Sequence, residues 1–462
     1  MKPDKLNITA LALVIAMGGF LLGFDATVIS GAGPFVRQYY GLEGEHGSLQ
    51  YGWAVSSLGW GAMAGNLCAG LLSDRFGRRA VLRLTALLFI GSALLAALST
   101  SFTTFVMARI CSGLAVGAAI LTAPVYIAEI APAGRRGGLV SLNQLMIVTG
   151  ISASFFSNYF LLGVGADNWR WMLGVQAAPA LLFLLLLLAV PESPRWLFGK
   201  GRGQQALDIL SSLHGGAAAL EELGQIRGSL HTVSPASLAA RLRGIFGARL
   251  RFVLLFALGI AFFQQITGIN AIFYYLPTIF AQAGDGLSSA FAQSVVVGLV
   301  NFGMTFVAIR LIDRVGRRPL LVTGVAGMAV SLLSIAWAFN AAQLAADATP
   351  AVNAPLVLCA IVGFVACFAI SLGPVMWVML AEIFPNEQRA AAISVVGFWN
   401  SAVSASVTMI FPWELQRLGP AGTFLGYGLM AVAGLLFLAK WAPETKGKTL
   451  EDLEGVLMRA TT

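Results

Sequence analysis

Twelve apolar runs, each long enough for a membrane-spanning helix, constrain this chain of 462 residues more than any other feature. An α-helix needs roughly 20 apolar residues to cross about 30 Å of hydrocarbon. With 58% hydrophobic and 11% charged residues, the composition excludes a soluble domain and predicts a lipid bilayer as the surroundings. The runs lie near residues 8–33, 52–73, 80–100, 102–128, 138–162, 171–190, 252–278, 288–312, 319–340, 355–381, 390–412 and 421–441.

The positive charges are sorted between alternate loops. If the N-terminus is cytoplasmic, most Arg and Lys residues fall on that side, and only Arg37, Arg170 and Arg417 lie opposite. This asymmetry predicts that both termini are cytoplasmic. It also accounts for the net charge of +8, so nucleic acid is not an expected partner. All four cysteines fall in predicted spans, and neither a disulfide framework nor a metal site is indicated.

The two halves of the chain repeat the same motifs in the same order. SDRFGRR at 73–79 recurs as IDRVGRRP at 312–319, AEIAPAGRR recurs as AEIFPNEQR, and PESPRW recurs as PETKGK. Three pairs at similar offsets imply a duplicated six-helix unit. We therefore expect an all-α integral membrane protein with twelve transmembrane helices in two pseudo-symmetric halves. The expected parts are an N-terminal six-helix bundle at 1–190, a cytoplasmic helical linker at 191–251, a C-terminal six-helix bundle at 252–441 and a cytoplasmic tail at 442–462.

The motifs as a set resemble the sugar porter family of the major facilitator superfamily. That family holds bacterial xylose, galactose and glucose symporters and animal glucose facilitators. The resemblance implies the major facilitator fold, sugar transport by alternating access, and function as a monomer. The matching segments span the chain: GLLSDRFGRR at Gly70, PVYIAEIAP at Pro124, PESPRWL at Pro191, QQITGINAIFYY at Gln264, LIDRVGRR at Leu311, GPVMWVMLAEIFP at Gly373 and PETKGKTLE at Pro443.

Two ionisable residues at membrane depth suggest proton coupling. Asp25 lies within the first apolar run and Arg109 within the fourth. Such groups are costly in hydrocarbon, and an arginine that keeps its proton needs an anion. Our hypothesis is that Asp25 takes a proton from outside, releases Arg109 and permits closure around the substrate. The alternative is that Arg109 reaches the interface while Asp25 caps a broken helix. By resemblance, proton symporters keep an acid at this place in GFDATVISG, whereas facilitators tend to have a neutral residue.

A set of amides at membrane depth predicts a monosaccharide site. Amides both donate and accept hydrogen bonds, as sugar hydroxyls require, and a tryptophan offers a flat apolar face. A single amide would more simply tie helices together. The set matches the family's sugar-contacting positions by resemblance, but Ser401 and Ser404 stand where the family often has Trp and Asn, which leaves the sugar open. The predicted site consists of Gln144, Gln264, Gln265, Asn270, Asn301, Trp377 and Asn400.

Charged residues at the cytoplasmic helix ends predict a latch. Arginine forks bridge carboxylates or helix C-termini on neighbouring elements. Plain topology-setting charge is the alternative, but acids contribute little to topology, so their presence favours a latch. The resemblance implies that such pairs close the cytoplasmic side in the outward-facing state. The residues are Asp74, Arg75, Arg78, Arg79, Glu129, Arg136 and Glu192 in the first half, and Asp313, Arg314, Arg317, Arg318, Glu382, Arg389 and Glu444 in the second.

These features together predict a proton-coupled hexose or pentose symporter in a plasma membrane, with a bacterial inner membrane favoured by the composition. No cofactor besides the coupling proton is expected, because no nucleotide-binding loop is visible. An enzyme is not expected, because no nucleophile, base and orienting group share catalytic spacing. Passive facilitation is the alternative. A sugar sensor with a transporter fold is a third possibility, but we expect a sensor to carry a long signalling tail after PETKGKTLE.

Overall fold

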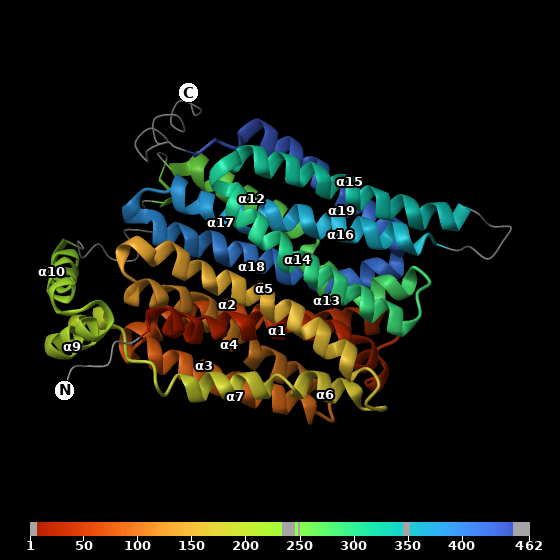
Figure 1. Cartoon of the computed structure of the whole chain (residues 1–462). Helices are drawn as coiled ribbons and strands as arrows, with labels where there is room; N and C mark the ends of the chain where they lie inside the picture. The colour runs from red at the N-terminus through yellow and green to blue at the C-terminus, as the bar shows by residue number, and fades with distance from the viewer. Residues whose placement is uncertain (1–6, 233–244, 248–249, 345–351, 447–462) are drawn as a thin grey trace. The chain divides into compact units, whose positions relative to one another are not determined.

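The computed structural model describes residues 7–232, 245–247, 250–344 and 352–446, and every regular element in these ranges is helical (Figure 1). Twelve helical segments within them are long and apolar enough to cross a membrane. In hydrocarbon, a helix satisfies all its backbone hydrogen bonds within one segment. The prediction of an all-α membrane protein with twelve spans is therefore confirmed.

The chain's regular elements follow the apolar runs. In the first half they are α1 (Ile8–Tyr39), α2 (Gly44–Phe76), α3 (Arg78–Ala97), α4 (Phe102–Ile130), the 3-10 turn η1 (Ala133–Arg135), α5 (Arg136–Leu161), α6 (Asn168–Gly174), α7 (Ala177–Leu186), α8 (Pro194–Gly199), α9 (Gly203–His214) and α10 (Gly216–Thr232). In the second half they are α12 (Arg251–Ile266), α13 (Ile269–Gln282), α14 (Leu287–Val315), α15 (Arg317–Leu344), α16 (Ala354–Ile370), α17 (Leu372–Ile383), α18 (Asn386–Arg417) and α19 (Gly419–Trp441).

The chain forms two compact units. Unit 1 comprises Met1–Ala32, Ser57–Ser157 and Gly163–Pro235, and unit 2 comprises Gly33–Ser56, Asn158–Leu162 and Ala236–Thr462. Helices α1, α2 and α5 therefore contribute residues to both units. The four segment bounds expected from sequence stay a prediction.

Unit 1 is built around α3 and α4. Helix α3 packs against α4, α6 and α7, and the buried core between these helices includes Ala16, Phe89, Ala119 and Phe183. Small side chains allow helix backbones in membranes to approach closely. Helices α2 and α4 use this effect: a Cβ atom added at Gly113 would lie 2.2 Å from a backbone carbonyl oxygen of α2. This close contact holds α4 in place within unit 1.

In unit 2, α15 packs against α16 and α19, and α14 lies beside α16 (Figure 1). Two of its spans are broken. The seventh consists of α12 and α13, which meet at Gly268 in a left-handed conformation with φ 84°. The tenth consists of α16 and α17, which meet at Ser371 with φ −123° and ψ −101°. Broken spans turn polar groups toward the interior of a bundle, and both breaks lie beside the amides described below.

Candidate functional site

Asp25 on α1 and Arg109 on α4 form a buried ion pair in unit 1. Arg109 donates from Nη1 to Asp25 Oδ1 at 3.0 Å and to the Asp25 carbonyl oxygen at 3.3 Å. The two side chains are 3% and 1% exposed. The structure thus brings together the two residues that the sequence predicts as partners, and Arg109 does not reach an interface.

Arg109 is held by a single guanidinium nitrogen. Within the described residues, its Nε and Nη2 atoms are buried and have no hydrogen-bond partner. A bidentate fork would have engaged two nitrogens with the two carboxylate oxygens. Instead, the second oxygen of Asp25, Oδ2, accepts a hydrogen bond from the hydroxyl of Ser112. The ion pair is therefore incomplete on the arginine side, and the position of Arg109 depends on the charge of one carboxylate.

Ser112 and Gln176 belong to this site and were missed in the sequence. Ser112 is three residues after Arg109, so the two side chains share one face of α4. That spacing could have revealed Ser112. Gln176 directs its side chain at the Asp25 carboxylate from the sixth span. No motif links it to the first span, because only packing brings them together.

Four amides form a hydrogen-bonded cluster in unit 2, which we call the amide cluster: Gln264 and Gln265 on α12, Asn270 on α13 and Asn400 on α18. The Oε1 atom of Gln264 accepts from Gln265 Nε2 at 3.1 Å and from Asn400 Nδ2 at 2.8 Å. Gln265 Nε2 also donates to Asn400 Oδ1 at 3.1 Å, and Gln265 Oε1 accepts from Asn270 Nδ2 at 2.9 Å. In this state the amides satisfy one another.

The amide cluster is tied to both breaks of unit 2. Gln264 donates to the carbonyl oxygen of Leu372, at the start of α17, at 2.8 Å. Asn270 donates to the hydroxyl of Ser404 at 2.7 Å. The serine that departs from the family pattern thus takes part in the cluster. Its hydroxyl accepts the hydrogen bond from Asn270.

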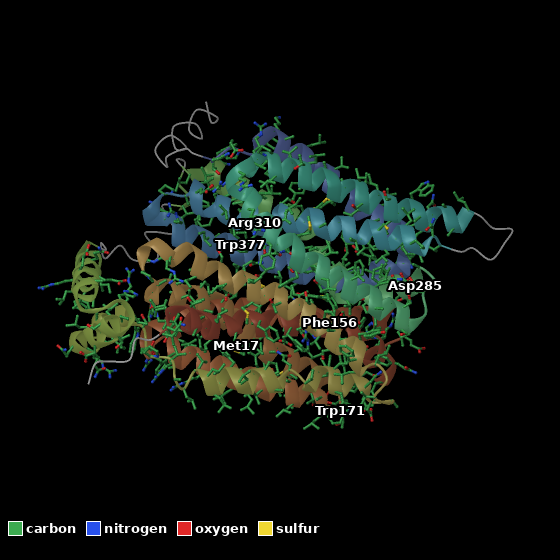
Figure 2. The ribbon with its side chains drawn as sticks, in the orientation of Figure 1. Met17, Phe156, Trp171, Asp285, Arg310 and Trp377 are labelled. Carbon is green, nitrogen blue, oxygen red and sulfur yellow. The ribbon has the colours of Figure 1, made fainter. Side chains whose placement is uncertain are left out.

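The other predicted sugar contacts lie outside these hydrogen bonds. Asn301 is buried on α14, and Gln144 is exposed on α5 in unit 1. Trp377 on α17, labelled in Figure 2, is 40% exposed, and a Cβ atom at Gly397 would lie 3.9 Å from its ring. Their roles in sugar binding stay predictions.

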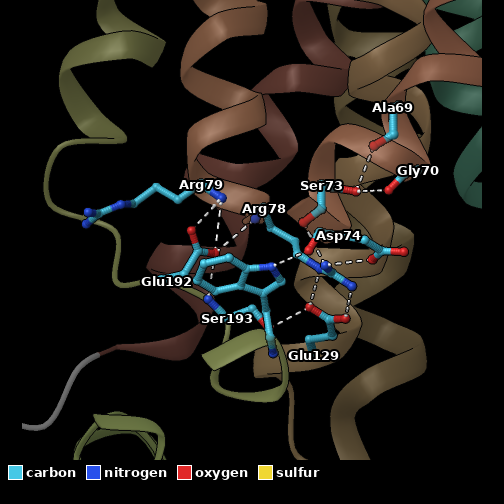
Figure 3. A network of polar contacts seen from close by, with 10 residues as sticks. Ala69, Gly70, Ser73, Asp74, Arg78, Arg79, Glu129, Glu192 and Ser193 are labelled. Carbon is cyan, nitrogen blue, oxygen red and sulfur yellow. Dashed lines mark hydrogen bonds and ion pairs between the residues drawn. The ribbon is translucent and has the colours of Figure 1, made fainter. Parts of the chain in front are cut away.

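A network of polar contacts between charged groups lies in unit 1 (Figure 3). Arg78 forms a bidentate pair with Glu129, with Nε and Nη2 each 3.0 Å from a carboxylate oxygen. Its Nη1 donates to Asp74 Oδ1 at 3.1 Å. Glu192 accepts from the backbone N–H groups of Arg78 and Arg79 at 3.0 and 3.2 Å. One guanidinium and one helix N-terminus thereby join α2, α3, α4 and the segment before α8.

Unit 2 repeats this arrangement with the matching residues. Arg317 donates from Nη2 to Glu382 Oε1 at 2.7 Å. Glu444 accepts from the backbone N–H groups of Arg317 and Arg318 at 3.1 and 3.2 Å. Because the duplicated motifs place equivalent residues at equivalent helix ends, the sequence repeat is also a repeat of contacts. Each of these contacts lies within one unit.

Glycine is required at the start of each network. Gly77 and Gly316 have φ values of 97° and 103°, in the left-handed region that favours glycine. A Cβ atom would lie 2.4 Å from a Glu192 oxygen at the first position and 2.8 Å from a Glu444 oxygen at the second. The glycine therefore lets the carboxylate approach the backbone N–H groups that follow.

The remaining predicted latch residues make fewer contacts. The guanidinium of Arg75 lies over the Phe76 ring at 5.2 Å, and Arg136 is exposed. Arg389 donates to the carbonyl oxygen of Phe384 at 3.3 Å, and the carbonyl oxygen of Arg314 accepts from Lys446 at 2.7 Å. Asp313 lies in α14, and its side chain is outside the described part of the structure. The latch role of the whole set stays a prediction.

Glu444 makes unit 2 sensitive to acid. Burial raises the pKa of this carboxyl, but hydrogen bonds from the backbone N–H groups of Lys446, Arg317, Arg318 and Thr445 lower it more, so the pKa lies below its usual value. A carboxyl whose pKa is lower in the folded protein stabilises the fold above its ordinary pKa. That stabilisation is lost as the pH falls through the folded-state pKa.

We expect Glu444→Gln to lower the thermal midpoint by roughly 1–2 °C at neutral pH, since the group is partly exposed. The difference from wild type should shrink as the pH falls below about 4.3, the ordinary pKa of a glutamate, and disappear below the lowered folded-state pKa, where wild-type Glu444 is protonated as well. Thermal unfolding in detergent across this range checks the expectation. Glu221→Gln, at an exposed position on α10, is the control. A difference that is independent of pH would contradict the assignment.

Comparison with known proteins identifies the family and the fold of this chain. A profile described as "Sugar (and other) transporter" matches residues 11–457. The chain is 38% identical over 450 residues to the D-xylose transporter of Levilactobacillus brevis, which covers 96% of this chain and 95% of the relative. It is 37% identical over 453 residues to the arabinose-proton symporter of Bacillus subtilis (97% and 94%). An inward open structure of the xylose transporter from E. coli superposes with a TM-score of 0.85 at 34% identity, covering 97% of this chain and 100% of that one.

Proposed function

Because the chain belongs to the sugar transporter family, we propose that it is a proton-coupled monosaccharide symporter that works by alternating access. The buried Asp25–Arg109 pair carries this proposal. Relatives named as a D-xylose transporter and an arabinose-proton symporter support a pentose as substrate, and one named as a glucose transporter supports a hexose. The protein is proposed to act as a monomer in a bacterial inner membrane, with both termini cytoplasmic and no cofactor besides the coupling proton.

The coupling step follows from the geometry of the pair. When Asp25 is ionised, its charge holds Arg109 through one nitrogen. Protonation removes that attraction, while Nε and Nη2 of Arg109 are already without partners among the described residues. A buried guanidinium in this condition is unfavourable unless it finds another acceptor. Proton binding at Asp25 thereby favours a local rearrangement of α1 against α4, which is proposed to be coupled to the larger movement of alternating access.

Sugar binding is proposed to occur at the amide cluster. Sugar hydroxyls both donate and accept, so they can replace amide–amide hydrogen bonds without leaving buried polar groups unpaired. Gln264, Gln265, Asn270 and Asn400 supply these groups, and the hydroxyl of Ser404 is a further partner beside Asn270. The networks at Arg78–Glu129 and Arg317–Glu382 are proposed to close the cytoplasmic side during the cycle.

Transport in proteoliposomes tests the proposal. Labelled D-xylose, L-arabinose, D-glucose and D-galactose are supplied outside, with the lumen one pH unit more alkaline or at equal pH. Symport of one proton per sugar predicts accumulation of up to about tenfold per pH unit, abolished by a protonophore. Protein-free liposomes are the control. Equilibration to equal concentrations regardless of the gradient would make the protein a facilitator, and binding without flux would favour a sensor.

A further inference from the structure

An acidic side chain that the coupling step above does not use, Glu414, lies within a span of unit 2. Glu414 is half-buried in the last turn of α18, inside the span Ala391–Arg417. Its Oε2 atom accepts a hydrogen bond from the hydroxyl of Tyr427 on α19 at 2.6 Å. Tyr427 is 5% exposed. A neutral phenol therefore holds this carboxyl, where Asp25 has a guanidinium.

The charged groups around Glu414 are engaged elsewhere. Arg417, one turn further along α18, pairs with Glu45 at 2.6 Å. Arg37 donates to the Leu42 carbonyl oxygen and to Ser48, and Asp285 accepts from Ser289 and Gln293. Two tyrosines also lie near this end of α18: Tyr275 on α13 donates to the Thr408 carbonyl oxygen, and Tyr51 on α2 packs edge-on against Tyr275. Glu43 and His46 lie within two residues of Glu45 and are exposed. No cation among the described residues bonds to the Glu414 carboxyl, so its charge can change without breaking an ion pair.

Tyr427 links this carboxyl to the bend of the seventh span. Gly268, in its left-handed conformation, separates α12 from α13. A Cβ atom added there would lie 3.3 Å from Cδ2 of Tyr427, so the tyrosine ring packs directly on the bend. The bend in turn separates Gln265 of the amide cluster from Asn270. The phenol thus touches backbone that sets the spacing of two proposed sugar-binding amides.

An aromatic stack extends the same connection along α13. The ring centroids of Tyr427 and Phe411 are 6.0 Å apart, and those of Phe411 and Tyr275 are 5.2 Å apart, both in stacked geometry. Tyr275 has non-helical dihedral angles, φ −121° and ψ 15°, two residues before Pro277. Tyr427 therefore packs directly on Gly268, and it is connected to the non-helical residue Tyr275 through the ring of Phe411.

We propose that Glu414 is a second proton-binding site, which controls the bend between α12 and α13 through Tyr427. It rests on the proposed transport function, which it extends. The proton binds to the carboxylate from water and no covalent bond changes. Ionised Glu414 accepts a charge-assisted hydrogen bond, which is roughly twice as strong as one to a neutral carboxyl. Protonation weakens the hold on Tyr427, and the ring then restrains the bend less.

Hydrogen–deuterium exchange of residues 266–282 tests this inference in the purified full-length protein. After correction for intrinsic exchange, wild type should lose protection as the pH falls, by about fivefold or more, the lower end of typical coupling between linked sites. Glu414→Gln should remove this dependence, so that residues 266–282 show at every pH the lower protection that wild type shows at low pH. Glu43→Gln, at an exposed acid in unit 2 just before α2, is the matched control and should behave as wild type.

Tyr427→Phe keeps the ring but removes the hydroxyl, so it should also give pH-independent exchange at the acid level. It keeps the proposal falsifiable if Glu414→Gln fails to fold. The inference is overturned if protection of residues 266–282 depends on pH in either variant as it does in wild type. It is also overturned if protection in wild type does not depend on pH. In Asp25→Asn, protection of residues 266–282 should still depend on pH as in wild type. The exchange measurement requires no sugar flux, so the two proposals can fail separately. Absence of gradient-driven sugar uptake would overturn the symport proposal alone. An unchanged pH dependence of protection in Glu414→Gln would overturn this inference alone.

Discussion

Asp25→Asn is expected to abolish sugar accumulation while sugar exchange continues. The amide is nearly isosteric and keeps an oxygen that accepts from Arg109 Nη1, but it cannot take up a proton at physiological pH. A variant that permanently resembles protonated Asp25 can still change conformation with sugar bound. The accumulation ratio should therefore fall from up to about tenfold per pH unit to about one, while counterflow of labelled sugar stays within a few-fold of wild type.

Asp167→Asn is the matched control for this experiment. Asp167 also pairs with an arginine, Arg170, but its side chain is 67% exposed. An exposed pair contributes little, so the substitution should leave both accumulation and counterflow as in wild type. Accumulation that persists in Asp25→Asn would mean that another group carries the proton. Loss of counterflow as well would reduce Asp25 to a structural partner of Arg109.

Arg109→Met is expected to produce the largest loss of stability. Removal of one partner from a buried ion pair typically costs about 3–5 kcal/mol, because the other charge is left uncompensated. Here the remaining charge is Asp25, 3% exposed, and its neighbours Ser112 and Gln176 are uncharged. The thermal midpoint in detergent should fall by roughly 3–5 °C, since in a chain of 462 residues each kcal/mol corresponds to about 1 °C. Arg75→Met, at an exposed position, should leave the midpoint close to that of wild type.

The double variant Asp25→Asn with Arg109→Met separates charge from packing. Without either charge, the site loses the penalty of an isolated ion, so most of the lost stability should return. Stabilities that simply add would instead show that Arg109 acts through packing of its side chain and not through Asp25. A double variant as unstable as Arg109→Met alone would lead to the same conclusion. Thermal melts of the four proteins complete the cycle.

The two proposed proton-binding residues, Asp25 and Glu414, have different roles. Asp25 is paired with a buried cation, so its protonation releases a charge inside unit 1. Glu414 is paired with a phenol, so its protonation weakens a single hydrogen bond inside unit 2. The first change is large and suits an obligatory coupling step. The second is smaller and suits adjustment of the bend beside the amide cluster.

Several parts of the site could be predicted because they follow from sequence alone. Repeated motifs identified Arg78, Glu129, Arg317 and Glu382 as candidate latch residues at equivalent helix ends, and the structure pairs Arg78 with Glu129 and Arg317 with Glu382. Asp25 and Arg109 could be paired because two ions at membrane depth require each other. These inferences depend on local pattern and on the cost of charge in hydrocarbon, both of which are readable without coordinates.

Other parts could not be predicted, because they depend on which helix faces meet. Ser404 was identified as a departure from the family pattern, yet its hydrogen bond with Asn270 depends on the packing of α13 against α18. Gln176 reaches Asp25 across more than one hundred residues of chain. Glu414 carries no motif, and its importance appears only through Tyr427 and Gly268.

The sequence by itself determined the number of spans, the duplication and the identity of the buried ions. Hydrophobic length, motif repetition and the cost of an unpaired charge are properties that a linear chain already possesses. Only the tertiary structure decided that Arg109 is held through one nitrogen, that four amides satisfy one another, and that Tyr427 rests on the bend at Gly268. Those features depend on distances and angles between distant segments, which the close packing of helices sets to within a fraction of an ångström.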